Sequence, residues 1–114
     1  MKTSTLAASC GFVHAAGEQT HCVQGIFAGD LLSWAMGRAK EGDAWFTVMG
    51  NVNTVAVAAL ADCACVVLCH GAEWDADALQ KAEEQGVELY RSSLAEFEAA
   101  YLAAAKLGLP LPQA

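Results

Sequence analysis

A run of six apolar residues, "ACVVLC" at 64–69, constrains the fold of this chain more than any other feature. A strand with one face in water alternates apolar and polar residues. This run is apolar at every position, which is typical of a strand covered on both faces, as in parallel sheets flanked by helices. The run therefore predicts a central parallel strand, and His70-Gly71 directly after it predicts where that strand ends.

The sequence on both sides of this run alternates between strand and helix patterns, which implies right-handed crossovers and helices on both faces of a sheet. We therefore expect one α/β domain of three layers, with a mostly parallel central sheet flanked by helices. The expected elements in chain order are a strand at 43–49, a helix at 54–63, the strand at 64–69, a helix at 75–85, a strand at 87–90 and a helix from Ser93 onward.

The beginning of the chain is expected to add one helix and two strands. Ser4 or Thr3 is expected to cap a helix that runs through about Cys10 and stops at Gly11, because glycine tolerates the positive φ of a helix end. The segments "FVHAA" and "HCVQGIFAG" then have the composition of two short strands joined by a turn at 17–19.

The final helix has a predicted start signal and a predicted apolar face. Residues 93–96, "SLAE", fit a capping box, in which a serine and a glutamate satisfy each other's backbone donors. One stripe of this helix is expected to consist of Leu94, Phe97, Tyr101 and Ala104.

Composition limits the possible partners. The 114 residues suit one domain, and 55% hydrophobic residues leave apolar surface on so short a chain, which favours a homodimer. The net charge is −7 and the six Lys and Arg residues are dispersed, so we expect no nucleic-acid binding. We also expect no membrane span, because no apolar run reaches about 18 residues. Five cysteines without a secretory signal indicate reduced thiols and a cytoplasmic protein.

Turns after the predicted strands supply candidate binding residues. Asp30, after Gly29, is placed to cap a helix that ends at Gly42 and also to border a ligand-binding edge. The turn 50–54, "GNVNT", precedes a helix without an acidic residue, so its amides and carboxamides could face an anion or a nucleotide. The predicted ligand-binding residues are Gly29, Asp30, Thr47, Asn51, Asn53, Thr54, His70 and Gly71.

A second constellation has metal-binding residue types. Cys63, Cys65, Cys69 and His70 could hold zinc or iron in a metal- or redox-linked accessory protein. On one strand, however, the three thiols would be strung over about 20 Å and could not converge unaided, so packing in the core is the preferred interpretation. We predict no resident metal and no cofactor.

The sequence contains no recognisable catalytic set. It has neither the GxxxxGK[ST] loop that cradles phosphates nor a GxGxxG dinucleotide motif, and no Ser-His-Asp or Cys-His arrangement can be assembled. We predict no catalytic residue, and a small kinase or transferase is the least favoured function.

Four segments in order, "GIFAGDLLSWAM", "AKEGDAWFTV", "NVNTVAVAALAD" and "KAEEQGVELYRSSLAEFE", resemble the DRTGG domain family over nearly the whole chain. "HCVQG" stands about where the pentapeptide that names the family is expected. The resemblance implies a domain at 1–109, followed by a short tail at 110–114.

The family is similar to the N-terminal domain of HPr kinase/phosphorylase, an α/β domain without the kinase's phosphate loop. Its members occur attached to phosphotransacetylases and between the CBS domains of some pyrophosphatases. Small free-standing members occur near iron hydrogenase genes. Together with the apolar excess and the missing catalytic set, the resemblance predicts a non-catalytic regulatory module, homodimeric and cytoplasmic, that senses an adenine nucleotide or docks onto a partner enzyme. The alternative is the accessory protein with the cysteine cluster, for example one associated with a hydrogenase.

Overall fold

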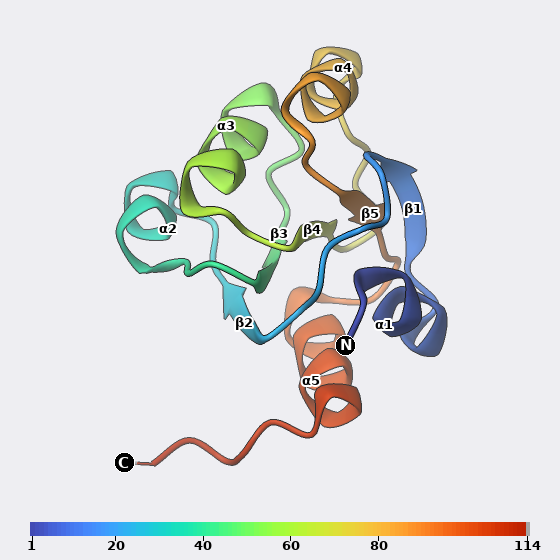
Figure 1. The fold of residues 1–114 in the computed structure, drawn as a ribbon, viewed down its shortest axis with the longest axis vertical. Coiled ribbons are helices and arrows are strands. Elements are labelled where there is room, and N and C mark those ends of the chain that lie inside the picture. The colour runs from blue at the N-terminus through green and yellow to red at the C-terminus, as the bar shows by residue number, and fades with distance from the viewer. Residues whose placement is uncertain (114) are drawn as a thin grey trace.

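The computed structural model describes residues 1–113, which form one three-layer α/β unit (Figure 1). The elements in chain order are α1 (Thr3–Cys10), β1 (Val13–Ala16), β2 (Gly25–Ala28), α2 (Leu32–Arg38), β3 (Asp43–Thr47), α3 (Val52–Ala61), β4 (Cys65–Leu68), α4 (Ala76–Gln85), β5 (Leu89–Arg91) and α5 (Glu96–Leu107). Residues 109–113 of the tail have no regular secondary structure, and residue 114 of the predicted tail lies outside the described residues.

The strands form one sheet in the order β1-β5-β4-β3-β2. β2, β3, β4 and β5 are parallel, and β1 runs antiparallel to β5. β4 occupies the middle of the sheet and all four of its residues are buried, which confirms the prediction made from its continuous apolar run. The mostly parallel sheet is confirmed as well.

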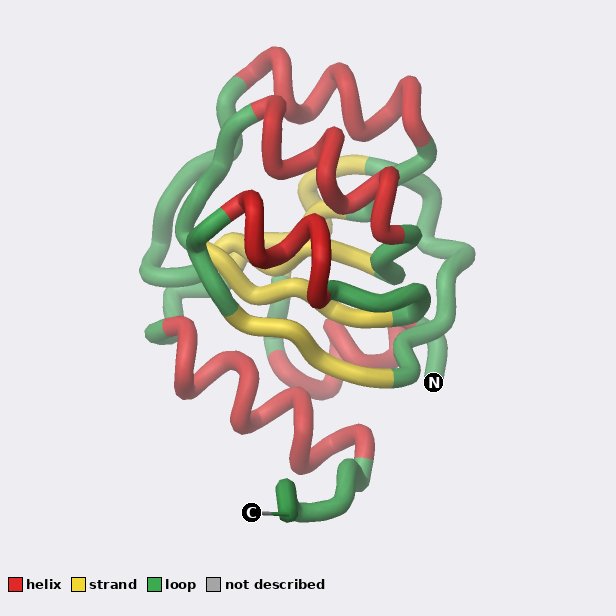
Figure 2. Tube along the Cα trace, turned by 90° about the vertical axis from the view of Figure 1, so that its left-hand side faces the viewer, coloured by secondary structure: helices red, strands yellow, loops and turns green. Residues whose placement is uncertain are grey.

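Helices cover both faces of the sheet, as Figure 2 shows from the side. α2, α3 and α4 lie together on one face, and α1 and α5 lie on the other. Neighbouring residues of β3 point to opposite faces, so Trp45 belongs to the core under α2–α4 and Phe46 to the core under α1 and α5. The predicted three-layer architecture is therefore confirmed. Within the described chain, no helix has both the length and the apolar character needed to span a bilayer.

β1 and β2 are not neighbours, contrary to the expectation of two strands joined directly by a turn. They lie at opposite edges of the sheet, and the segment between them crosses the amino edge (Figure 1). Backbone bonds hold this segment against the start of the chain, from Thr3 N to the His21 carbonyl at 3.0 Å and from Val23 N to the Met1 carbonyl at 2.7 Å. The chain bends at 17–19, as predicted, but this bend begins a crossover to the other edge of the sheet instead of a hairpin.

Several predicted helix starts are wrong, although the helices themselves are present. α1 begins after Lys2, and the Thr3 hydroxyl bonds other segments instead of capping. α2 begins after Leu31 without a side-chain cap and ends at Arg38, before Gly42. α5 begins after Ala95, whose N–H bonds Glu98, so the capping box predicted at 93–96 does not form.

The two aromatic residues of the apolar stripe predicted for α5 face solvent instead of the core, whereas Leu94 packs against the core. Ala99 and Ala103 are fully buried against the sheet, whereas Phe97 is 75% exposed and Tyr101 is 65% exposed. The small alanines allow α5 to approach the sheet closely, and this approach leaves the aromatic side chains on the outer side of the helix.

Candidate functional site

Three parallel strands end at one edge of the sheet, and the predicted binding residues follow them there. Asp30 comes after β2, and Thr47 ends β3. The Thr47 hydroxyl donates to Asp30 Oδ1 at 2.7 Å, and the backbone N–H of Val48 donates to the same oxygen at 2.9 Å. Asp30 therefore joins two strand ends instead of capping α2, and Gly29 accepts a hydrogen bond from the Trp45 indole at 3.0 Å.

Glu96 completes this cluster, and the sequence analysis did not identify it. Its backbone N–H donates to His70 Nε2 at 3.1 Å, which anchors the start of α5 to the end of β4. Burial and the neighbouring Asp30 carboxyl raise the pKa of Glu96 to about 7. Burial opposes the shift at Asp30, but hydrogen bonds from Thr47 and Val48 lower the pKa of that carboxyl. One proton near neutral pH can thus be held between the two carboxyl groups.

The 50–54 turn uses most of its polar groups internally. Asn51 Oδ1 accepts from the Thr54 N–H at 3.1 Å and caps α3, while the Thr54 hydroxyl donates to the Met49 carbonyl at 2.7 Å. Asn53 is exposed. A Cβ at Gly50 would meet the Glu73 carbonyl at 2.7 Å, so this turn packs tightly against the segment that precedes α4. Ligand binding by Asn51 and Asn53 stays a prediction.

His70 and Gly71 form a tight reversal after β4, with φ values of 60° and 69°. Their amides donate to the carbonyls of Leu94 at 2.8 Å and Ser92 at 3.0 Å, so the reversal positions the loop that follows β5. Gly71 also lines a pocket of 260 Å³ at this end of the sheet, together with Arg91, Ser92 and Ser93. The structure thus brings the predicted residues to one edge, but in separate groups.

The cysteines of the alternative site point to different cores. Cys63 packs under α2–α4, whereas Cys65 and Cys69 pack under α1 and α5. Burial raises the pKa of Cys63 and of Cys69 to about 12 and also raises that of Cys65, which disfavours the thiolate needed for metal binding. In residues 1–113, no three His, Cys, Asp or Glu side chains are arranged to hold a metal ion.

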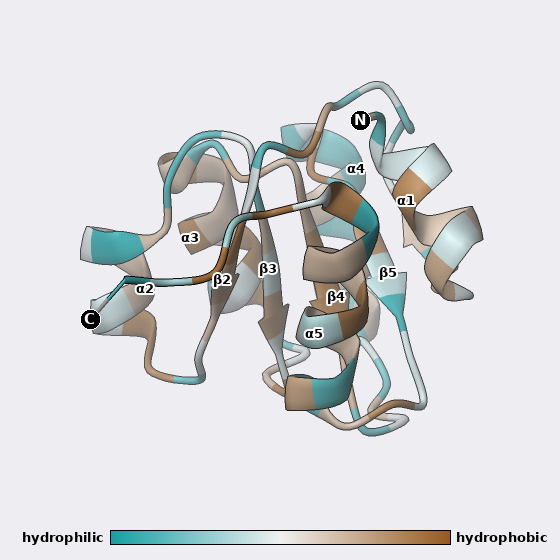
Figure 3. Cartoon of the chain, turned by 90° about the horizontal axis from the view of Figure 1, so that it is seen from below, coloured by the Kyte–Doolittle hydropathy of each residue, from teal (hydrophilic) through white to brown (hydrophobic). Residues whose placement is uncertain are grey.

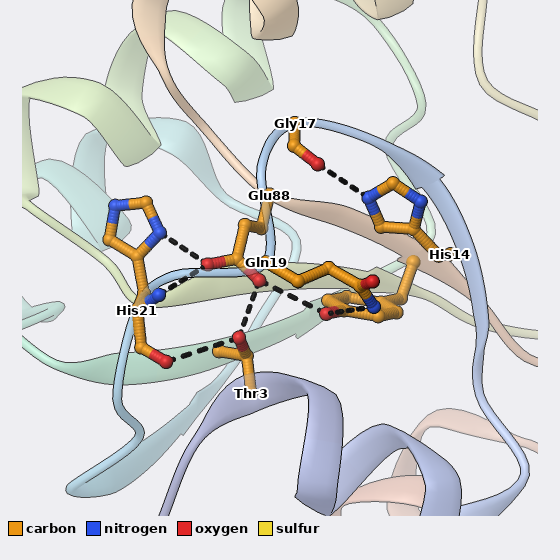
Figure 4. Close-up of polar contacts among 7 residues, drawn as sticks. Thr3, His14, Gly17, Gln19, His21 and Glu88 are labelled. Atoms are coloured by element: carbon orange, nitrogen blue, oxygen red, sulfur yellow. Dashed lines mark hydrogen bonds and ion pairs between the residues drawn. The ribbon is translucent and has the colours of Figure 1, made fainter.

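A buried carboxyl group, Glu88, organises the opposite edge of the sheet (Figure 4). Its side chain is completely inaccessible to solvent. Glu88 Oε1 accepts from the Thr3 hydroxyl and from the Tyr90 hydroxyl at 3.0 Å. Its Oε2 accepts from the His21 backbone N–H at 2.8 Å and bonds the His21 ring through Nδ1. Gln19 donates to the Tyr90 hydroxyl at 3.2 Å, so the network ties the β1–β2 crossover to α1 and β5.

No family model and no curated protein matches this sequence. The structure is similar to the crystal structure of the CBS and DRTGG domains from the regulatory region of Clostridium perfringens pyrophosphatase, with a TM-score of 0.72 and 8% sequence identity. The match covers 90% of this chain and 45% of that one, so the chain spans less than half of the protein that it matches. That structure holds the activator diadenosine tetraphosphate.

The comparison confirms the resemblance at the level of the fold: this is a DRTGG-like domain. That neighbour is a regulatory region of a pyrophosphatase. Similarity to the N-terminal domain of HPr kinase/phosphorylase stays a prediction.

Proposed function

We propose that this chain is a regulatory module that senses an adenine nucleotide and acts on a partner enzyme without catalysing a reaction itself. The observation that carries the proposal is the fold shared with a regulatory region that is complexed with a dinucleotide activator. The carboxyl edge of the sheet is where open α/β folds bind ligands, and the predicted residues Asp30, Thr47, Asn53 and Gly71 lie there.

The hydrogen bonding at this edge supports a non-catalytic role. The Thr47 hydroxyl donates a hydrogen bond to Asp30, and His70 Nε2 accepts one from the Glu96 backbone N–H. His70 Nε2 is therefore occupied by a backbone N–H, and the carboxylate that Thr47 contacts has a lowered pKa, which makes Asp30 a weak general base. All five cysteines are free, which supports a reducing compartment, and we place the protein in the cytoplasm.

We further propose a homodimer formed through the outer face of α5. Figure 3 shows the C-terminal segment leaving the end of this helix and crossing the sheet on the side of β2. Together they form a groove of 630 Å³ whose lining is almost entirely apolar, including Ile26, Phe97, Tyr101, Leu109 and Pro112. Exposed apolar surface of this kind is typical of an interaction site.

The face is complementary to a second copy of itself. When two α5 helices pack antiparallel about the point between Ala100 and Tyr101, Tyr101 of each copy faces Ala100 of the other, and Phe97 faces Ala104. Each bulky ring then meets a small residue. The same arrangement brings Lys106, in the last turn of one helix, to the acidic first turn of the other, where Glu96 and Glu98 lie.

A thermal-shift measurement tests nucleotide sensing. A ligand present at about 100 times its Kd stabilises the native state by about 2.7 kcal/mol, which corresponds to a rise in Tm of roughly 10 °C for a domain of this size. We expect this response to AMP, ADP, ATP or diadenosine tetraphosphate, with guanine nucleotides as controls. No shift with any adenine nucleotide at millimolar concentration would refute the proposed function.

Light scattering at micromolar concentration tests the dimer. We expect the mass of two chains for the wild type and of one chain for Tyr101→Lys, because the substitution places a charge in the apolar groove. The matched control is Leu60→Lys, which changes an equally exposed apolar residue on α3 and should remain dimeric. A monomeric wild type would exclude this interface.

A further inference from the structure

Arg91 lies at the carboxyl edge of the sheet and is not among the binding residues predicted from the sequence. It ends β5 and is exposed. In residues 1–113 the single ion pair is His21–Glu88, so the Arg91 guanidinium has no carboxylate partner. What distinguishes Arg91 from the other Lys and Arg residues is its position, because it lines two neighbouring pockets at this edge.

The first of these pockets is chemically suited to phosphate. It has a volume of 260 Å³, and its lining includes Arg91, Ser92, Ser93 and Gly71. No acidic residue lines it. A guanidinium with two nearby serines supplies the charge-assisted and neutral donors that phosphate oxygens accept, and arginine binds phosphate through two parallel hydrogen bonds.

The second pocket shares Arg91 and has a different character. Its volume is 320 Å³, and His14, Trp74 and Leu79 provide flat or apolar surface. Glu73 lies in this pocket and would repel a phosphate there, but its carboxylate can accept a hydrogen bond from a ribose hydroxyl or a base amino group. Arg91 therefore lies between a cationic hydroxyl-lined pocket and a pocket suited to a nucleoside.

We propose that these two pockets form one nucleotide site, with the phosphates on Arg91, Ser92 and Ser93 and the nucleoside between His14, Trp74 and Glu73. The inference rests on the proposed function and locates its ligand. The site includes the predicted residue Gly71 and no residue of the 50–54 turn, although Glu73 packs against Gly50 of that turn. The amides of His70 and Gly71 hold the 92–94 segment of the site in place.

The test is isothermal calorimetry on the full chain with pyrophosphate, ADP and adenosine. We expect Arg91→Gln to weaken both pyrophosphate and ADP by about tenfold or more, as loss of a charge-assisted hydrogen bond predicts. Arg38→Gln is the matched control: it removes the same charge, but Arg38 lies on α2 and stacks on Trp34, so binding should change less than about twofold.

A second variant separates the two pockets. Glu73→Gln should weaken ADP and adenosine without weakening pyrophosphate, because it removes a negative charge from the pocket that Arg91 shares, and circular dichroism checks that each variant is folded. If ADP binds the wild type and Arg91→Gln equally, the site inference fails and the proposed function stands. If pyrophosphate binds through Arg91 but ADP binds no more tightly, the phosphate pocket is supported and nucleotide sensing fails. If neither ligand binds, both are refuted.

Discussion

Glu88 is the residue whose replacement most directly tests how this fold is held together. Four groups bond its buried carboxyl group: the hydroxyls of Thr3 and Tyr90, and the backbone N–H and ring Nδ1 of His21. Glu88→Ala removes every acceptor at once and leaves a cavity. Breaking a buried, hydrogen-bonded pair costs about 3–5 kcal/mol, and the cavity acts in the same direction. We expect a loss of about 4 kcal/mol, a large part of a total stability of about 5–15 kcal/mol.

Glu88→Gln keeps the shape of the side chain and tests the same network more gently. Its single oxygen can serve His21, and its amide group can donate to the hydroxyls of Thr3 and Tyr90, which can rotate to accept. The expected cost is about 1–2 kcal/mol. Glu84→Gln on exposed α4 is the control and should change stability by less than about 0.5 kcal/mol.

Urea unfolding at equilibrium gives the free energies, and native-state hydrogen exchange locates the effect. Exchange in the crossover between β1 and β2 should accelerate in both Glu88 variants more than exchange in α3, because the crossover loses its anchor. If Glu88→Ala unfolds with a free energy within 1 kcal/mol of the wild type, the buried network contributes no net stability and the reasoning is wrong.

Three further changes have expected outcomes. The pKa of Glu96 in the folded state, about 7, lies above the usual value of 4.5, so protonated Glu96 stabilises the fold fully below pH 4.5 and this stabilisation is lost as the pH rises through 7. The free energy of unfolding, measured in urea, should therefore fall between pH 4.5 and 8. After allowance for solvent screening, we expect this fall to be smaller by about 1 kcal/mol in Glu96→Gln. Gly17→Ala should destabilise by about 2 kcal/mol or more in thermal melts, since its Cβ would meet the Val87 carbonyl at 2.2 Å and φ is 85°; an unchanged Tm would contradict this contact. Asn51→Ala should cost about 1 kcal/mol through loss of the α3 cap, whereas Asn53→Ala should cost under half of that.

The sequence was most informative where one local pattern has one structural solution. The continuous apolar run of β4 required burial on both faces, and Gly11 and Gly86 ended α1 and α4 in the left-handed conformation. Helix starts were harder to predict because Asp30 had two possible partners. Its carboxyl group could bond the amides of α2 or the strand end at Thr47, and tertiary contact decided for Thr47.

Contacts between residues far apart in the chain could not be predicted from the spacing of residues in the sequence. Glu88 stands in a short strand pattern, and only the fold places Thr3 and His21 against it. The same limit applies to α5, where helical periodicity is satisfied by two alternative faces. The alanine face packs on the sheet, and the aromatic face stays outside.

The pairing of the first strand with the last has a consequence for the order of events during synthesis. β1 has no partner in the sheet until β5 is available, and Glu88 must also be present before the crossover can be anchored. β2, β3 and β4 are consecutive in both chain and sheet, and they can assemble with α2 and α3 first. Residues 1–24 are synthesised before the rest of the domain, but we expect them to form their native contacts last, because contacts distant in sequence require the longest loops to close.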